Sequence, residues 1–436
     1  MSKETRERHD ALKLPSSIQE TGLTMGMLSE LAIKLIYAAG EIGATEIGDQ
    51  LRLPFVGVIE RVLELLDREE LVNIVGTEGF GAQAYRYTIS NKGIARARQA
   101  MQHNQYVGPA PVPLERYNEM MRAQSIGEVM LDEPDVEAAF EGLVVSQDML
   151  DRVGPAINSG QSIFLYGPPG NGKTTMALRM AQLLGRDPLY IPYAASVDSH
   201  IIKIYDDFNH TRANTSSSPA RRDQSSSRDA ALLDSRWVLI ERPTVVVGGE
   251  LTLGSLDLIW DPTAKYYEAP FQMKANGGMF LVDDFGRQQM DPQDLLNRWI
   301  VPLETRVDFL SLHTGKKIEI PFEELVVFST NLDPKDLVDQ AFLRRIRHKI
   351  HVGDPTAQQF HQVFQDECRR RDVEYRRDGF THLVREWYAK PKRAFKNCHP
   401  RDILDQLRDI AKYKQLETVA TPRMIDRACS AYFAKL

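Results

Sequence analysis

Apolar residues recur at the spacing of amphipathic helices through the first seventy residues of the chain. A first helix is expected from about residue 23, and Gly40 is suited to end it. Its inner face carries the apolar residues Leu28, Leu31, Ala32, Leu35 and Ala39. A second, short helix fits residues 45–51. Pro54 suits the first turn of a third helix, because proline is tolerated there.

Two short apolar runs then predict a β-hairpin, over residues 71–75 and 84–89. Gly76, Gly79 and Gly81 lie between the runs, as a turn requires. Residues 91–101 return to a helical pattern. Three helices, a hairpin and a closing helix resemble a winged helix-turn-helix domain.

The rest of the chain divides by pattern. The Pro-rich run over residues 106–113 predicts an extended, semi-rigid linker. Apolar strands then alternate with helical stretches, which is typical of α/β folds with a largely parallel sheet. We therefore expect a disordered tail (1–17), a winged-helix-like domain (18–103), a linker (104–125), an α/β domain (126–352) with a mobile Ser-rich insertion (about 211–231), and a helical domain (353–436).

Composition places the chain among ordinary globular proteins. Apolar residues make up 42% and the net charge is -6, so bulk charge does not predict nucleic-acid binding. Three scattered cysteines, Cys368, Cys398 and Cys429, indicate free thiols in a reducing compartment. The polar N-terminus has no signal-peptide pattern and no stretch is apolar enough to span a bilayer. We therefore expect a cytoplasmic protein without membrane insertion.

The strongest motif is a phosphate-binding loop. It follows the apolar run 163–166, opens a helix and matches GxxxxGK[ST] in full. Glycines let the backbone N–H groups converge on phosphate oxygens, and the helix N-terminus adds positive potential. Lys173 is expected to neutralise the β- and γ-phosphates of ATP, and Thr174 to bind Mg²⁺. The predicted nucleotide-binding residues of this segment are Gly167, Pro168, Pro169, Gly170, Asn171, Gly172, Lys173, Thr174 and Thr175.

A second motif is an apolar strand that ends in two acids, over residues 277–284. Asp283 is expected to position Mg²⁺, and Asp284 to polarise the attacking water. An apolar strand followed by acids is the Walker B pattern. On its own this pattern is weak; its place after the phosphate-binding loop strengthens it.

With both motifs in place, the sequence resembles the AAA+ family of ATPases over roughly residues 126–436. The resemblance implies an α/β P-loop NTPase core with helices on both faces of a parallel sheet, and a helical lid. Asn331, at the end of the run 325–331, matches the sensor 1 position and would contact the γ-phosphate or water. Arg344 and Arg345 match the arginine-finger segment, and which of them acts stays open. Arg401, after Pro400, matches sensor 2 of the lid.

One departure concerns the Walker B acids, because most AAA+ proteins have Asp-Glu where this chain has Asp283-Asp284. Aspartate is shorter by one methylene, so its reach to the water differs. Hydrolysis remains expected, and a slow nucleotide switch remains an alternative to a motor.

A hairpin over residues 306–322, with Gly315 in its turn, precedes the sensor 1 strand. This placement is similar to the AAA+ clade that includes MoxR-like ATPases, enhancer-binding activators and RuvB-like motors. In that clade the hairpin often faces the pore of the ring, which would place Lys316 and Lys317 at or beside its tip. The activators' GAFTGA loop is absent; the run 251–256 stands before the Walker B motif instead.

Charge argues against DNA binding by the winged-helix-like domain. Residues 20–102 hold eight Lys and Arg against eleven Asp and Glu, a net charge of -3, whereas DNA affinity depends on neutralising phosphates. The sequence therefore predicts an ATP- and Mg²⁺-dependent ring, by family resemblance a hexamer, that remodels a protein substrate as a MoxR-like chaperone does. The alternative is a DNA-associated AAA+ motor or regulator that docks through the winged helix, for which Lys316 and Lys317 are the supporting residues.

Overall fold

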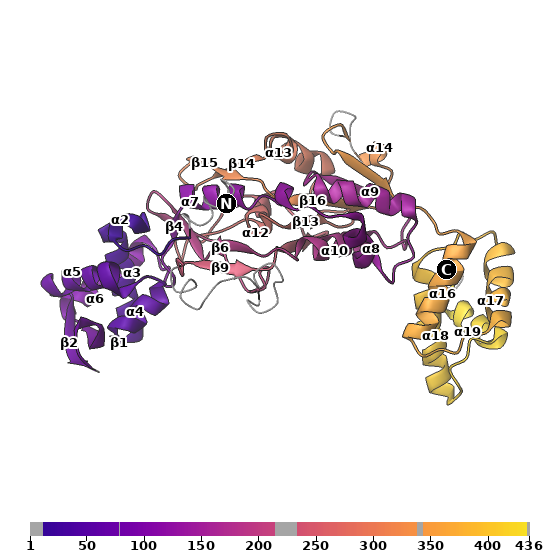
Figure 1. Cartoon of the computed structure of the whole chain (residues 1–436), viewed down its shortest axis with the longest axis horizontal. Helices are drawn as coiled ribbons and strands as arrows, with labels where there is room; N and C mark the ends of the chain where they lie inside the picture. The colour runs from indigo at the N-terminus through magenta and orange to yellow at the C-terminus, as the bar shows by residue number, and fades with distance from the viewer. Residues whose placement is uncertain (1–11, 78, 214–232, 338–342, 434–436) are drawn as a thin grey trace.

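The computed structural model describes residues 12–77, 79–213, 233–337 and 343–433. Figure 1 shows three parts in a row: an N-terminal helical part, a central part built on sheets, and a C-terminal helical part. The predicted Ser-rich insertion falls mostly on residues 214–232, outside the described residues.

The N-terminal part combines helices with a small antiparallel sheet in the order β1-β3-β2. Its elements are α2 (Ile18–Thr21), α3 (Met25–Ala39), β1 (Glu41–Gly43), α4 (Ala44–Leu51), α5 (Glu60–Arg68), β2 (Val72–Thr77), β3 (Tyr85–Ile89) and α6 (Asn91–His103). Gly40 ends α3 as expected. The third long helix begins at Glu60 and not after Pro54, because Val56 and Gly57 have non-helical backbone angles.

The predicted disordered tail is wrong for residues 12–17, which pack against the central part. Leu12 is buried, and Lys13 forms a β-bridge with Leu233. The backbone of Leu12 also accepts a hydrogen bond from Asp234 N–H at 2.8 Å. Residues 1–11 lie outside the described residues.

The predicted linker is also wrong in part, since most of it belongs to the central part. Val112–Pro113 forms β4, which pairs in parallel with β7 (Ala194–Val197). The next ten residues form α7 (Leu114–Ala123). The buried side chains Leu114, Tyr117, Met120 and Met121 recur on one face of this helix, and their burial attaches the segment to the central part. The prolines before the helix stay extended, as Val112–Pro113 does in β4.

The central part is built on a sheet of five parallel strands in the order β10-β13-β16-β5-β17. These strands are β10 (Thr244–Val247), β13 (Met279–Val282), β16 (Leu325–Thr330), β5 (Ile163–Tyr166) and β17 (His348–His351). Parallel strands point their carboxyl ends toward one edge, so the segments that follow β5, β13 and β16 meet there.

Both faces of this sheet are covered by helices. Ile163 and Leu165 of β5 lie in one core, and Phe164 between them lies in another, as alternation along a strand requires. The first core includes residues of α8 (Glu133–Phe140), α9 (Gln147–Asn158) and α10 (Lys173–Leu184). The second includes residues of α12 (Phe271–Ala275) and α13 (Pro292–Thr305). The expected α/β class is confirmed.

A second, mixed sheet joins the central part to the N-terminal part, in the order β11-β12-β8-β7-β4. It contains β8 (His200–Lys203), β11 (Ile259–Trp260) and β12 (Tyr267–Glu268). Two antiparallel strand pairs pack into the core beneath this sheet. One is β6 (Leu189–Pro192) with β9 (Trp237–Ile240), and the other is the hairpin of β14 (Val307–Ser311) and β15 (Lys317–Pro321). The last is the hairpin that the sequence predicts, and Gly315 in its turn has φ 84°.

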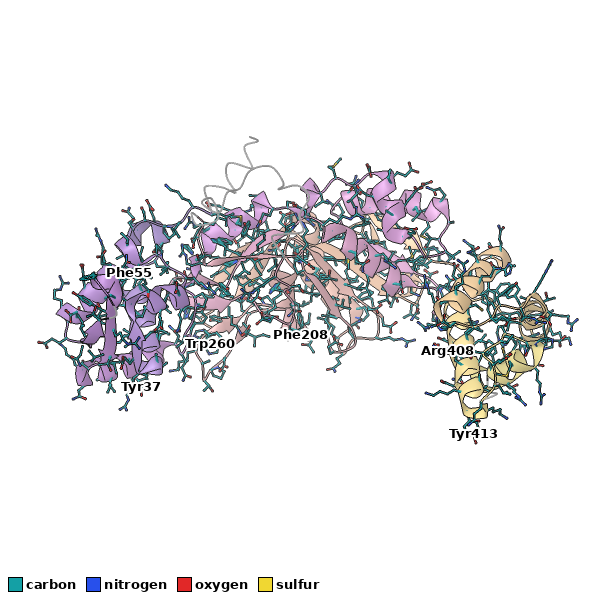
Figure 2. All side chains as sticks on the ribbon, turned by 60° about the horizontal axis from the view of Figure 1, so that its bottom comes forward. Tyr37, Phe55, Phe208, Trp260, Arg408 and Tyr413 are labelled. Atoms are coloured by element: carbon teal, nitrogen blue, oxygen red, sulfur yellow. The ribbon has the colours of Figure 1, made fainter. Side chains whose placement is uncertain are left out.

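The C-terminal part is helical, as expected, and has its own core. It contains α16 (Ala357–Arg370), α17 (Arg377–His382), α18 (Cys398–Lys414) and α19 (Pro422–Tyr432). Figure 2 shows Tyr413, near the end of α18, pointing away from this core. Among the described residues, no helix is long and apolar enough to cross a membrane.

Candidate functional site

A cleft of about 740 Å³ opens where the carboxyl ends of β5, β13 and β16 face the C-terminal part. Its walls come from the loop between β5 and α10, the acids after β13, Asn331 after β16, and residues of α16 and α18. The topology that the sequence predicts therefore brings its separate motifs to one place.

Two glycines of the phosphate-binding loop occupy conformations and spaces that other residues cannot. Gly167 has φ 138°, and a Cβ there would lie 2.4 Å from the carbonyl oxygen of Val352 in the segment after β17. Gly170 has φ 80°, and its Cβ would lie 2.6 Å from the sulfur of Cys398 in α18. The loop thus lies between the segment after β17 and the C-terminal part. Both contacts are possible only because glycine has no side chain.

Lys173 begins α10 and its side chain folds back over the loop. Its Nζ donates to the carbonyl oxygens of Gly167 at 2.9 Å and Pro168 at 3.0 Å, and to Asn331 Oδ1 at 2.6 Å. Burial lowers the pKa of Lys173, while the negative charges of Asp284 and Asp283 oppose that shift. The ammonium therefore lies at the centre of the predicted phosphate site.

Thr174 and Asp283 form the pair expected at a magnesium site. The Thr174 hydroxyl lies 2.9 and 3.1 Å from the two carboxylate oxygens of Asp283. Hydroxyl and carboxylate oxygens are ligands that Mg²⁺ prefers, together with water and substrate phosphates. The residues present therefore fit the predicted metal.

Asp284 has a left-handed backbone, with φ 49°. Aspartate and asparagine adopt this conformation more readily than most residues, because their short polar side chains can bond locally. Asn331 Nδ2 donates to Asp284 Oδ1 at 2.8 Å. Asn331 thus connects Lys173 to Asp284.

The C-terminal part contacts the phosphate-binding loop through residues that no sequence motif predicts. Cys398 N–H donates to the Gly170 carbonyl at 2.9 Å, and Asn397 N–H donates to Asn171 Oδ1 at 3.3 Å. Asp354 accepts from Asn171 Nδ2 at 2.7 Å and from Lys396 Nζ at 2.5 Å. Lys396, Asn397 and Cys398 directly precede the predicted sensor 2 segment, whereas Asp354 lies shortly after β17, far from it in the chain.

Arg401 lies in α18 and lines the cleft. Its Nε donates to Asp402 Oδ1 at 2.7 Å. The other predicted nucleotide-binding residues from Pro169 to Thr175 also line the cleft.

Arg344 and Arg345 do not lie among the residues that line the cleft of their own chain. Arg344 is exposed, and Arg345 Nε donates to Glu304 Oε1 of α13 at 2.5 Å. Part of the predicted finger segment, Ala341 and Phe342, lies outside the described residues.

Comparison with known proteins adds two findings. A family model described as a domain of unknown function (DUF8689) matches residues 356–431, which is most of the C-terminal part. No curated protein matches the chain.

Solved structures resemble the chain only in fold. RuvB of Thermotoga maritima, titled a Holliday junction branch migration motor, is 13% identical with a TM-score of 0.35, over 72% of this chain and 73% of that one. NtrX of Brucella abortus is 12% identical with a TM-score of 0.39, over 66% of this chain and 55% of that one. Similarity this low assigns no function. The parallel sheet, the phosphate-binding loop after β5 and the helices on both faces form an α/β P-loop core.

Proposed function

We propose that this chain is a Mg²⁺-dependent ATP hydrolase of the AAA+ class that acts as a ring, a hexamer by family resemblance, to remodel a protein substrate. One observation carries the proposal. Five side chains predicted from three separate motifs meet in one cleft: Lys173, Thr174, Asp283, Asp284 and Asn331.

The proposed roles follow from the contacts. Lys173 and the loop N–H groups hold the β- and γ-phosphates, and Thr174 and Asp283 hold the metal. Bound Mg²⁺ supplies positive charge that offsets the charge developing on the transferred phosphoryl group. Asp284 orients the attacking water and accepts its proton, and Asn331 keeps Asp284 in place.

The C-terminal part acts as a lid in this proposal. Arg401 lies at the cleft wall, and the segment just before it is bonded to the phosphate-binding loop through Cys398. A ligand that moves the loop therefore acts directly on the lid. Nucleotide state would set the lid angle through this contact, as in hinge motions of other enzymes.

Arg344 or Arg345 would act on the neighbouring subunit. Because neither lines the cleft of its own chain, a contact with phosphate has to come from another copy. An arginine supplied in this way stabilises charge in the transition state and contributes a large part of the rate.

A protein substrate or adaptor is favoured over DNA by the surfaces at the other end of the molecule. Ile74 and Val75 of β2 and Phe80 in the segment before β3 are exposed, and exposed apolar side chains suit protein docking better than binding to phosphates. Of the two lysines that supported the DNA alternative, Lys316 is paired with Asp198 at 2.7 Å.

The deciding experiment measures the ATPase rate against protein concentration for the wild type, Arg344→Ala and Arg345→Ala. We expect a cooperative rise with concentration for the wild type. One variant should be inactive and should inhibit the wild type when the two are mixed, because each active site needs an arginine from its neighbour.

A rate linear in protein concentration, with both variants as active as the wild type, would contradict the shared site. The chain would then be a slow nucleotide switch. Single-turnover kinetics would separate that switch from a motor.

A further inference from the structure

Asn171 occupies a position in the phosphate-binding loop that phosphate binding leaves open. The motif GxxxxGK[ST] specifies two glycines, a lysine and a hydroxyl residue, and Asn171 is the last of the four positions that it leaves unspecified. Such a loop binds phosphates through backbone N–H groups, which every residue except proline supplies. The asparagine side chain therefore needs an explanation other than contact with phosphate.

The side-chain amide of Asn171 is buried against the C-terminal part. Only 3% of the residue is exposed. Its Nδ2 donates to Asp354 Oδ1 at 2.7 Å, and its Oδ1 accepts from Asn397 N–H at 3.3 Å. The backbone carbonyl of Asn171 also accepts from Asn397 Nδ2 at 3.3 Å. Both polar atoms of the side chain are thus bonded to residues that follow β17 in the chain.

Asp354 extends this contact to the segment that connects the central and C-terminal parts. It lies between Gly353 and Pro355, on the way from β17 to α16. Its carboxylate accepts from Asn171 Nδ2 and also from Lys396 Nζ at 2.5 Å. One carboxylate therefore holds together the phosphate-binding loop, the connecting segment and the residues before α18.

The same contacts hold the start of α18. Asn397 immediately precedes this helix and Cys398 is its first residue. Cys398 N–H donates to the Gly170 carbonyl at 2.9 Å, next to the two bonds of Asn397. Arg401 lies close to one helical turn after Cys398 and lines the cleft. The position of the Arg401 guanidinium therefore depends on how the start of α18 is held.

We propose that Asn171 is a positioning residue: through Asp354 and Asn397 it holds the start of α18 so that Arg401 reaches the phosphates of a bound nucleotide. This role rests on the proposed function, in which Arg401 contacts nucleotide phosphate. The backbone of Asn171 serves the nucleotide and its side chain serves the lid. An alanine at this position keeps the backbone N–H but loses both side-chain hydrogen bonds.

The test measures the rate at which the full chain releases fluorescent ADP, because this rate requires nucleotide binding but no hydrolysis. Asn171→Ala should speed release by about tenfold, since the lid loses a hydrogen bond to a charged group. Asn209→Ala is the matched control. Asn209 Nδ2 also donates to an aspartate, Asp206, at 3.0 Å, but this pair is not among the residues that line the cleft. The control should release ADP at the wild-type rate.

Arg401→Ala tests whether Asn171 acts through Arg401. On its own this substitution should also speed ADP release. Added to Arg401→Ala, Asn171→Ala should change the rate by less than about twofold, because the group that it positions is already gone. Effects that multiply in the double variant would show that Asn171 acts independently of Arg401, and would overturn the proposal.

An exchange of two side chains separates this contact from a general loss of stability. Asn171→Asp alone brings two carboxylates together and should speed release at least as much as Asn171→Ala does. Asp354→Asn added to it restores one amide and one carboxylate with donor and acceptor reversed. The exchanged pair should return the release rate to within about threefold of the wild type.

A wild-type release rate in Asn171→Ala, or no recovery in the exchanged pair, would contradict the positioning role and leave the proposed ATPase intact. If the wild type binds no fluorescent ADP, the proposed function fails and the positioning role fails with it. If Asn171→Ala does not fold, Asp354→Ala breaks the same hydrogen bond from a side chain that is 34% exposed, and the same increase in release rate is expected.

Discussion

The side-chain amide of Asn331 connects the lysine of the phosphate-binding loop to the second acid after β13. Its oxygen accepts from Lys173 at 2.6 Å and its nitrogen donates to Asp284 at 2.8 Å. An aspartate at this position could not donate to a second carboxylate, and a leucine could do neither. The residue type is therefore set by the charges on either side of it.

Asp284→Asn should lower the catalytic rate by about a hundredfold or more while leaving ATP affinity intact, because asparagine keeps the left-handed backbone but cannot accept a proton. Steady-state ATPase assays and nucleotide titration measure the two effects separately. Asp284→Glu is the matched control: it keeps the carboxylate and should keep measurable hydrolysis. An asparagine variant as fast as the wild type would remove Asp284 from the mechanism.

Glu324 is a buried acid outside the site. Neither of its carboxylate oxygens has a hydrogen-bond partner among the described residues, and burial raises the pKa of Glu324 well above its usual value. An acid whose pKa is raised by folding stabilises the fold below its unfolded pKa, and that contribution is lost as the pH rises through the folded pKa.

Glu324→Gln should therefore stabilise the chain at high pH, by about 1–3 kcal/mol for a buried group freed of its charge. Melting curves of the wild type and the variant from about pH 5 to about pH 9 should diverge as the pH rises. The exposed Glu417→Gln is the control, for which we expect no such divergence. Parallel curves for Glu324→Gln and the wild type would show that Glu324 is not buried as the structure has it.

At the scale of elements, the contact between the phosphate-binding loop and α18 is the main addition to the predicted picture. Gly170 and Cys398 are 228 residues apart in the chain, yet a single Cβ on Gly170 would lie 2.6 Å from the Cys398 sulfur. The phosphate-binding loop and α18 are therefore in direct contact at Gly170, with no room there for a side chain.

Gly170→Ala should therefore weaken nucleotide binding more than Gly172→Ala does. Both glycines have positive φ, 80° and 87°, so both variants share a backbone strain of about 1–2 kcal/mol. A Cβ on Gly172 meets nothing within 4 Å, so only Gly170→Ala also displaces α18. Fluorescent-nucleotide titration measures the difference.

Cys398→Ala provides the check on that interpretation. Added to Gly170→Ala, it removes the sulfur that the new Cβ meets and should restore affinity toward the level of Gly172→Ala. If the changes in binding free energy caused by the two substitutions simply add, the two residues are not in contact.

The sequence predicts the hairpin of β14 and β15, but it does not predict which residues the hairpin packs against. Leu310, Ile318 and Ile320 bury one face of it in the core of the second sheet. At its tip, His313 stacks on Trp260 at a centroid distance of 4.1 Å. The tip is therefore fixed against the second sheet.

At the scale of the whole molecule, the three parts have different chemistry. The cleft lies between the central and C-terminal parts. The N-terminal part has a net charge of -3 over residues 20–102 and exposes several apolar side chains. A net negative charge disfavours binding to a duplex, and for this reason the partner proposed for this end is a protein.

We expect no binding of duplex or single-stranded DNA by the full chain even at low salt. Fluorescence anisotropy with a salt titration is the measurement, and Lys317→Ala is the matched variant, because Lys317 is exposed beside the hairpin turn. Affinity that falls steeply with salt and drops further in the variant would instead support the DNA-associated motor.

The sequence by itself determined the features that depend on local pattern. The phosphate-binding loop, the acids after β13 and Asn331 after β16 follow from residue types next to apolar strands, and alternation of strands with helices predicts a parallel sheet. In such a sheet the carboxyl ends meet at one edge, so the convergence of Lys173, Asp283 and Asn331 was predictable as well.

Only the tertiary structure decided which residues from distant segments touch. Leu12 and α7 read as tail and linker because their partners in the central core are contributed by strands far along the chain. The contact of Gly170 with Cys398, and the burial of Lys34 beside Asn104, likewise join residues with no local signal in common. Packing is decided by which surfaces complete a core, and the local spacing of residues does not encode it.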